Sequence, residues 1–308
     1  MADLMVTFLD QTLNNPFVLE IEPFASPASL PFAEKYGAIL ISAFPYEMMD
    51  VEGKFATLAD EYLENISLWR KSVDIPIIAS LDGTIAHAME EYCDKIEQAG
   101  AHALQLRLFF FPDDRDFRSA DYEKIFLEAV AKITYSIRIP LLINLPINFT
   151  NLFSMVEQLF YRGIQGFCLS NQQIITDIDL EQFDLIPTYG KTAELCSLFY
   201  LKWMGYLSSY FPKAHFAIRL NPSFQSDEPI KYILSGAHAA IINSSDEQSR
   251  NIEALIGNIS EWMLKNSFTK IEHFHGQLNF QPTLTPSAFE RKCWLEHYQS
   301  RYIQDNKE

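Results

Sequence analysis

The sequence predicts a (β/α)8 barrel, an α/β fold in which eight parallel strands alternate with helices. Eight short apolar runs rich in strand-forming residues recur along the chain, and segments between them have the apolar spacing of helices. This alternation is complete within about 250 residues, whereas a doubly wound sheet seldom needs eight units. The chain has 308 residues, 48% of them hydrophobic, which is enough for one large core. We therefore expect a single barrel domain over residues 1–308.

The expected strands and helices can be placed from these patterns. Two segments with helical periodicity, 85–98 and 152–161, are followed by glycines, Gly100 and Gly163, as is common where a helix ends. Residues 5–13 are expected to form a hairpin that closes the barrel floor, and residues 268–308 an irregular tail with a short helix. The strands are expected at 17–21, 38–42, 76–81, 103–108, 140–145, 166–170, 215–220 and 239–243, and the clearest helices at 85–98, 122–136, 152–161 and 192–211.

Composition limits the classes of partner. The chain has 40 acidic against 24 basic residues and a net charge of -16, which argues against nucleic acid or an anionic membrane surface. No apolar run is long enough to span a bilayer, and residues 1–10 lack the features of a signal peptide. The four cysteines, Cys93, Cys168, Cys196 and Cys293, have no metal-binding spacing. We expect reduced thiols and a cytoplasmic protein without nucleic-acid binding or membrane insertion.

The carboxyl ends of the expected strands are unusually charged. In a (β/α)8 barrel these ends form the mouth where functional residues gather. One interpretation is that the groups pair among themselves, and the other is that they line a rebuilt ligand site. Because an unpaired charge held away from water is costly, we expect both arginines to lie within ion-pair reach of the acids. The residues at these ends are Glu20, Glu22, Ser42, Asp82, Arg107, Asn144, Asn171, Arg219 and Asn243.

The order of several short segments resembles one family of barrels. These segments are 13–16 (LNNP), 75–81 (IPIIASL), 98–101 (QAGA), 139–152, 177–181 (DIDLE) and 288–291 (AFER). Each is weak alone, but together they resemble the dihydroorotate dehydrogenase-like family over nearly the whole chain. The resemblance implies an FMN-dependent barrel with the flavin lying across the mouth.

The positions that the resemblance assigns to the flavin are mostly changed. Glu20 and Glu22 stand where the family has small residues against the flavin ring, and Ser42 with Ala43 where it has a lysine and a serine. Asp82 and Arg107 stand at asparagine positions, and Asn144 at a lysine position. Phe110 stands where the dehydrogenases place a catalytic cysteine or serine. Arg219 with Leu220, and Asn243 with Ser244, replace glycines of the phosphate loops, so only Asn171 matches.

These changes predict that the flavin chemistry is lost. A phosphate cup requires a close backbone approach that glycine permits, and Arg219 with Leu220 would crowd it. Glu20 and Glu22 would add negative charge where reduced flavin becomes an anion, and Phe110 cannot act as a base. We therefore expect no catalytic residue, no FMN and no metal, and a pseudoenzyme that acts as an interaction subunit. The alternatives are an FMN-dependent oxidoreductase of the dihydroorotate dehydrogenase type and a binder of another small ligand.

The helix expected at residues 199–211 suggests how such a subunit would make contacts. Its apolar residues lie on nearly every side of the helix, whereas only one side can pack on the barrel strands. Either a partner or the chain's own tail after residue 268 should therefore cover another face. We expect Trp203 or Tyr206, with Tyr210, on the outward face. The acidic net charge favours a basic protein partner, with a homo-oligomer as the alternative and the loop 109–112 as the next candidate surface.

The remaining candidates for chemistry are interpreted as structural. His273 and His275 have no third ligand nearby in the sequence, and Ser80 has no partnered histidine. Cys168 is expected to pack in the core. The acidic residues Asp113, Asp114 and Asp116 are expected on a solvated loop.

Overall fold

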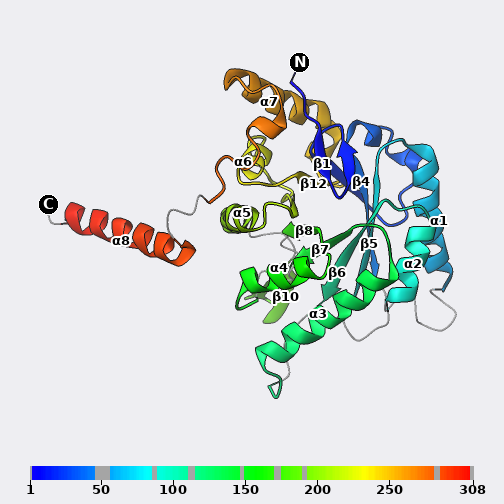
Figure 1. Cartoon of the computed structure of the whole chain (residues 1–308), viewed down its shortest axis with the longest axis horizontal. Helices are drawn as coiled ribbons and strands as arrows, with labels where there is room; N and C mark the ends of the chain where they lie inside the picture. Colours follow the sequence, from blue (N-terminus) through cyan, green and yellow to red (C-terminus); the bar gives the residue numbers. More distant parts are fainter. Residues whose placement is uncertain are drawn as a thin grey trace.

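Eight parallel strands close a barrel in the computed structural model, which confirms the predicted fold class (Figure 1). The strand order around the barrel is β11-β12-β3-β4-β5-β6-β7-β8. The structure describes residues 2–45, 56–84, 89–109, 115–145, 149–169, 175–188, 193–280 and 285–305. The strands are β3 (Phe17–Ile21), β4 (Ala38–Pro45), β5 (Ile77–Thr84), β6 (Ala103–Phe109), β7 (Leu141–Leu145), β8 (Gly166–Leu169), β11 (His215–Arg219) and β12 (Ala239–Asn243).

Helices connect all but one pair of consecutive barrel strands. The connection from β3 to β4 contains only two 3-10 turns, Pro27–Ser29 and Ala33–Lys35, so the expected alternation of strand and helix is wrong there. Pro27 and Pro31 lack backbone N–H groups and interrupt any longer helix in this connection. The connecting helices are α1 (Ala56–Ser72), α2 (Glu90–Gln98), α3 (Ser119–Ser136), α4 (Leu152–Tyr161), α5 (Ala193–Tyr210) and α6 (Glu228–Leu234), and α7 (Ile252–Lys265) follows the last barrel strand.

Glycines follow the ends of two of these helices, as predicted. Gly100 follows α2 with a φ of 100°, and Gly163 follows α4 with a φ of 92°. Each donates its N–H to a carbonyl of the last helical turn, at 3.0 Å. A residue with a Cβ would be strained in this left-handed conformation, so glycine fixes where the chain turns toward the next strand.

A hairpin fills the floor of the barrel, as the sequence predicted. It consists of β1 (Val6–Phe8) and β2 (Gln11–Leu13), which pair antiparallel. Its apolar side chains are buried against small inward-facing residues of the strands, such as Ala103 and Ala217. A Cβ added at Gly166 would lie 2.4 Å from Leu9 Cδ2, so the strand must carry a glycine where the hairpin enters.

Three histidine rings gather beside this hairpin. The ring centroid of His238 lies 4.9 Å from that of His215 and 4.3 Å from that of His275. His215 Nδ1 accepts a hydrogen bond from the backbone N–H of Leu9, and His238 Nδ1 accepts one from Phe216. Burial lowers the pKa of each ring, and the neighbouring rings lower the pKa of His238 further. The floor is therefore built around neutral imidazoles.

We expect acid to destabilise the fold through these rings. Their pKa values are lowered in the folded state, so below the unfolded pKa of about 6.5 the unfolded chain binds more protons. Stability should be complete above that pH and fall as the pH drops from 6.5 toward the folded pKa values. The free energy of unfolding, from urea denaturation at several pH values, should show this fall in the wild type and equally in His273→Gln, an exposed control. It should be smaller in His238→Gln, and an unchanged pH dependence in that variant would contradict the assignment.

Two elements beyond the barrel strands differ from expectation. An unpredicted hairpin of β9 (Ile175–Asp179) and β10 (Asp184–Thr188) follows β8. The tail contains α8 (Pro286–Asp305), a helix of 20 residues that extends away from the barrel (Figure 1). The expectation of a short tail helix is therefore wrong. Alanine, glutamate, arginine, lysine, leucine and glutamine are strong helix formers, and they continue this helix beyond any packing against the barrel.

Candidate functional site

The charged side chains gather at the barrel mouth as the sequence predicted. On β5 and β6, Asp82 and Arg107 each follow Ser80 and Gln105 by two residues. Because side chains alternate along a strand, all four share one face of the sheet, with Ser80 and Gln105 farther from the mouth. Glu22 lies beyond β3 and is exposed, whereas Phe110 and Asn171 lie outside the described residues. The residues in the carboxyl-terminal halves of their strands are Glu20, Ser42, Asp82, Arg107, Asn144, Arg219 and Asn243.

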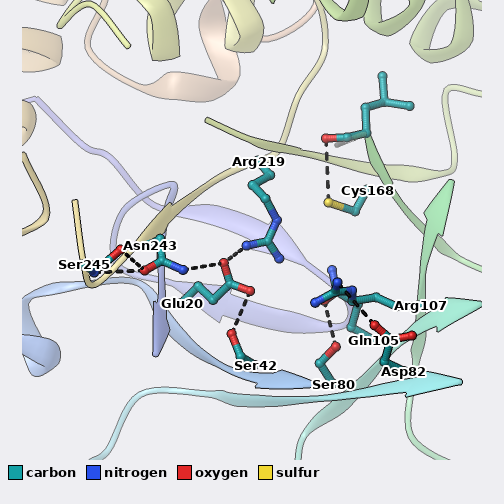
Figure 2. A network of polar contacts seen from close by, with 11 residues as sticks. Glu20, Ser42, Ser80, Asp82, Gln105, Arg107, Cys168, Arg219, Asn243 and Ser245 are labelled. Carbon is teal, nitrogen blue, oxygen red and sulfur yellow. Dashed lines mark hydrogen bonds and ion pairs between the residues drawn. The ribbon is translucent and has the colours of Figure 1, made fainter. Parts of the chain in front are cut away.

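Glu20 is the centre of the first cluster, which we call the Glu20 cluster and which comprises Glu20, Ser42, Arg219 and Asn243. These residues come from four neighbouring strands, β11, β12, β3 and β4 (Figure 2). Oε2 of Glu20 forms an ion pair with Nη1 of Arg219 and accepts a hydrogen bond from Asn243 Nδ2 at 3.2 Å. Oε1 accepts one from Ser42 Oγ at 2.9 Å. Both oxygens of a carboxylate that is only 2% exposed are therefore satisfied.

The Arg219 guanidinium is also largely buried, with 12% of the side chain exposed. Burial lowers its pKa to about 10, against the opposing effect of Asp246. The arginine still carries its charge at neutral pH. Its Nε and Nη2 atoms are buried and have no hydrogen-bond partner within the described part of the chain.

A second cluster, the Arg107 cluster, lies on β5 and β6 and comprises Ser80, Asp82, Gln105 and Arg107. Arg107 Nη2 lies 3.3 Å from Asp82 Oδ2, the residue opposite it in the register of the two strands. One step deeper, Ser80 Oγ donates to Gln105 Oε1 at 3.0 Å, and both residues are fully buried (Figure 2). Both arginines are thus paired with acids, as predicted, although Glu22 takes no part in a described ion pair.

The described mouth residues offer little for catalysis. Cys168 is fully buried on β8, and burial raises the pKa of its thiol to about 12, with Arg107 opposing. A protonated, enclosed thiol is a poor nucleophile, and the predicted packing role of Cys168 is confirmed. His102, His215 and His238 lie at or just before the starts of β6, β11 and β12, at the opposite end of the barrel from the mouth. Among the described mouth residues, no thiol or hydroxyl is hydrogen-bonded to a histidine.

Sequence reasoning missed Gln105 and Asp246. Gln105 precedes Arg107 by two residues on β6, so the alternation of a strand would have placed it inside the barrel. Asp246 follows β12 in a turn, and its Oδ2 is buried without a hydrogen-bond partner among the described residues. Burial raises the pKa of this carboxyl. No periodic signal marks a residue of this kind, because a turn has none.

The apolar helix α5 is covered on two sides by its own chain. The barrel buries Met204 and Leu207, and the tail covers Tyr206, which is 5% exposed. The Tyr206 hydroxyl donates to Glu290 Oε1 at 2.6 Å, and its ring centroid lies 4.8 Å from that of Phe280. Of the two residues expected to face outward with Tyr210, Tyr206 is buried, so that alternative is wrong, and Trp203 is half-buried; Tyr210 is exposed as predicted. The candidate loop 109–112 lies almost wholly outside the described residues.

Comparison with known proteins adds no identity to this site. The sequence matches no protein-family model and no curated protein. Within the described ranges, no group of three histidine, cysteine, aspartate or glutamate side chains could hold a metal ion. None of the described helices combines the length and the apolarity needed to cross a membrane. The physical arrangement of the residues is therefore the basis for a functional proposal.

We expect Arg219→Leu to destabilise the fold by about 3–5 kcal/mol, because it leaves the buried Glu20 carboxylate without its cation. Urea denaturation measures the loss. The matched control is Lys35→Ala, which removes an exposed partner of Glu253 and should change the free energy of unfolding far less, because water screens that pair. Equal unfolding midpoints for the two variants would show that the buried pair is not needed for stability.

Proposed function

We propose that this chain is a catalytically inactive barrel that serves as an interaction subunit of a larger assembly. The observation that carries the proposal is helix α8, which leaves the barrel with large apolar side chains exposed. Trp294, Leu295 and Tyr298 are 53%, 39% and 57% exposed. Exposed apolar residues gathered on one element are typical of a contact surface, whereas isolated ones are common anywhere.

The first turns of α8 are anchored, so its exposed part is presented in a defined direction. Oε1 of Glu290 accepts a hydrogen bond from the Tyr206 hydroxyl and lies 3.4 Å from Lys202 Nζ. Tyr206 and Lys202 both belong to α5. The Phe289 ring packs edge-on against Phe280, with centroids 5.4 Å apart. Beyond this anchor, the rings of Trp294 and Tyr298 stack one helical turn apart at 5.5 Å. A stacked aromatic pair beside Leu295 is a compact anchor for a partner groove.

The charge distribution indicates the kind of partner. Helix α8 contains as many basic as acidic residues, so the net charge of -16 lies in the rest of the chain. A groove that receives α8 would therefore lie close to a strongly acidic barrel. Basic side chains around an apolar groove would be attracted to that barrel and would speed association at low salt. We assign to the partner a basic rim and an apolar groove that accepts a helix.

The residues at the mouth do not fit FMN, which supports the inactive assignment. Arg219 holds Glu20 where the resemblance places a phosphate loop and the flavin ring. The Glu20 carboxylate would meet the negative charge of both the phosphate and a reduced ring. The two acids that lie within the described mouth strands, Glu20 and Asp82, are each paired with an arginine. No step of flavin chemistry can be built on these side chains.

We expect the purified chain to lack the visible absorbance of a flavin, because the Glu20–Arg219 pair occupies the strand ends that the resemblance assigns to the flavin and its phosphate. The spectrum should be recorded after gel filtration, and again after incubation with excess FMN followed by a second filtration. A flavin band at one equivalent per chain after either treatment would overturn the inactive assignment.

We expect the double substitution Trp294→Ser with Tyr298→Ser to release the chain from its assembly without unfolding it, because both side chains lie on the exposed part of α8. Light scattering of protein purified from its native cells gives the mass, and circular dichroism checks the fold. Tyr135→Ser on α3 removes an even more exposed tyrosine, at 92%, and is the matched control. The proposal fails if the double variant retains the wild-type mass, or if Tyr135→Ser loses it.

A further inference from the structure

The hairpin of β9 and β10 stands apart from the barrel sheet. Its two strands pair with each other and form a separate two-stranded sheet. Among the other described elements, none packs extensively against either strand. A two-stranded hairpin is only marginally stable by itself in water, and it gains stability from a further strand or from a surface that packs on it. A partner that covers this hairpin would therefore stabilise it.

One face of the hairpin and its turn carry large apolar side chains. The register places Ile178 directly opposite Leu185, so the two side chains share a face. Both are exposed, as are Leu180 and Phe183 in the turn. The Phe183 side chain is 91% exposed, which leaves almost all of its ring in water. Apolar side chains that gather on one short element are typical of a contact surface.

The other face of the hairpin is acidic. Asp179 lies directly opposite Asp184, and like charges at opposed positions of neighbouring strands repel each other. Residues 175–188 contain four acids and no lysine or arginine, so the hairpin itself cannot offset this repulsion. None of the ion pairs in the described part of the chain includes either aspartate. A cation from another molecule would relieve the repulsion.

These charges decide which partner fits the hairpin. A second copy of the chain would bring the same four acids and a net charge of -16, and the two copies would repel each other. The same repulsion opposes nucleic acid and an anionic membrane surface. A protein with lysine or arginine side chains beside an apolar surface complements both faces of the hairpin and is attracted to it from a distance.

We propose that the β9–β10 hairpin inserts into a cleft of a basic protein partner. An apolar wall of the cleft covers Ile178 and Leu185, and Phe183 reaches its base. Lysine or arginine side chains of the opposite wall lie between Asp179 and Asp184. This inference rests on the proposed interaction function, because it gives the same assembly a second contact besides α8.

The charge contact is tested with Asp179→Asn combined with Asp184→Asn. Asparagine keeps the Oδ1 acceptors that both aspartates offer to backbone N–H groups, so only the charges are lost. Assemblies that contain the wild-type or variant chain are purified from the native cells, and mass photometry follows their dissociation on dilution. The variant should dissociate at about fivefold higher concentration in low salt, with a smaller difference in high salt. Glu61→Gln with Glu64→Gln on α1 removes the same charge from another exposed site and should behave as the wild type does.

The apolar contact is tested with Phe183→Asn. Phe183 has a φ of 54°, in the left-handed region that asparagine tolerates well, so the turn should be retained. The variant should weaken the assembly about tenfold or more at both salt concentrations, because a large aromatic anchor is lost. Tyr161→Asn on α4 removes another exposed aromatic ring and is the matched control. Circular dichroism during urea denaturation checks that every variant folds as the wild type does.

The outcomes separate this inference from the proposed function. If both hairpin variants dissociate as the wild type does while the α8 double variant loses its partner, the hairpin contact is overturned and the proposed function stands. If the hairpin variants weaken the assembly and the α8 variant does not, the assignment to α8 fails and the hairpin contact stands. An effect of Phe183→Asn alone would overturn the basic wall, and an effect of the aspartate variant alone would overturn the apolar wall. A chain that purifies without any partner would overturn both proposals.

Discussion

A carboxylate that is almost wholly removed from water must have its charge and both its oxygens compensated, and this constraint organises the barrel mouth. Glu20 meets it with a cation from β11, an amide from β12 and a hydroxyl from β4. These contacts connect four neighbouring strands on one side of the barrel. These are the strand ends that the resemblance to flavin-binding barrels assigns to the cofactor. If that resemblance holds, charge compensation and flavin binding compete for one set of strand ends.

The opposite end of the barrel is closed by packing. Small inward residues such as Ala103 and Ala217 leave room that the N-terminal hairpin fills, and Gly166 is required where Leu9 enters. Neutral histidines then satisfy backbone N–H groups at this floor. Apolar packing thus fixes one end, and ion pairs fix the other. Among the described residues, the largely buried side chains of Glu20, Arg219, Ser80 and Gln105 form polar contacts on the mouth side of this hairpin.

The parts of the structure that follow from periodicity could be predicted from the sequence. Strands β3 and β12 and helix α4 begin and end where their apolar patterns do, and the pairing of both arginines follows from the cost of an uncompensated buried charge. The first crossover was missed because the prolines that prevent a helix there carry no period of their own. The position of Tyr206 was missed for a different reason. Its burial depends on Phe280 and Glu290, which are more than 70 residues away in the chain.

The same long-range contacts also support the proposed interaction role. The tail covers one face of α5 through Phe280 and Glu290, and this cover also fixes where α8 begins. Without it, α5 would expose its own aromatic face, and α8 would have no defined direction. The chain therefore covers an apolar surface on the barrel and exposes another on a projecting helix. A projecting helix reaches a partner groove that a rounded barrel surface could not enter.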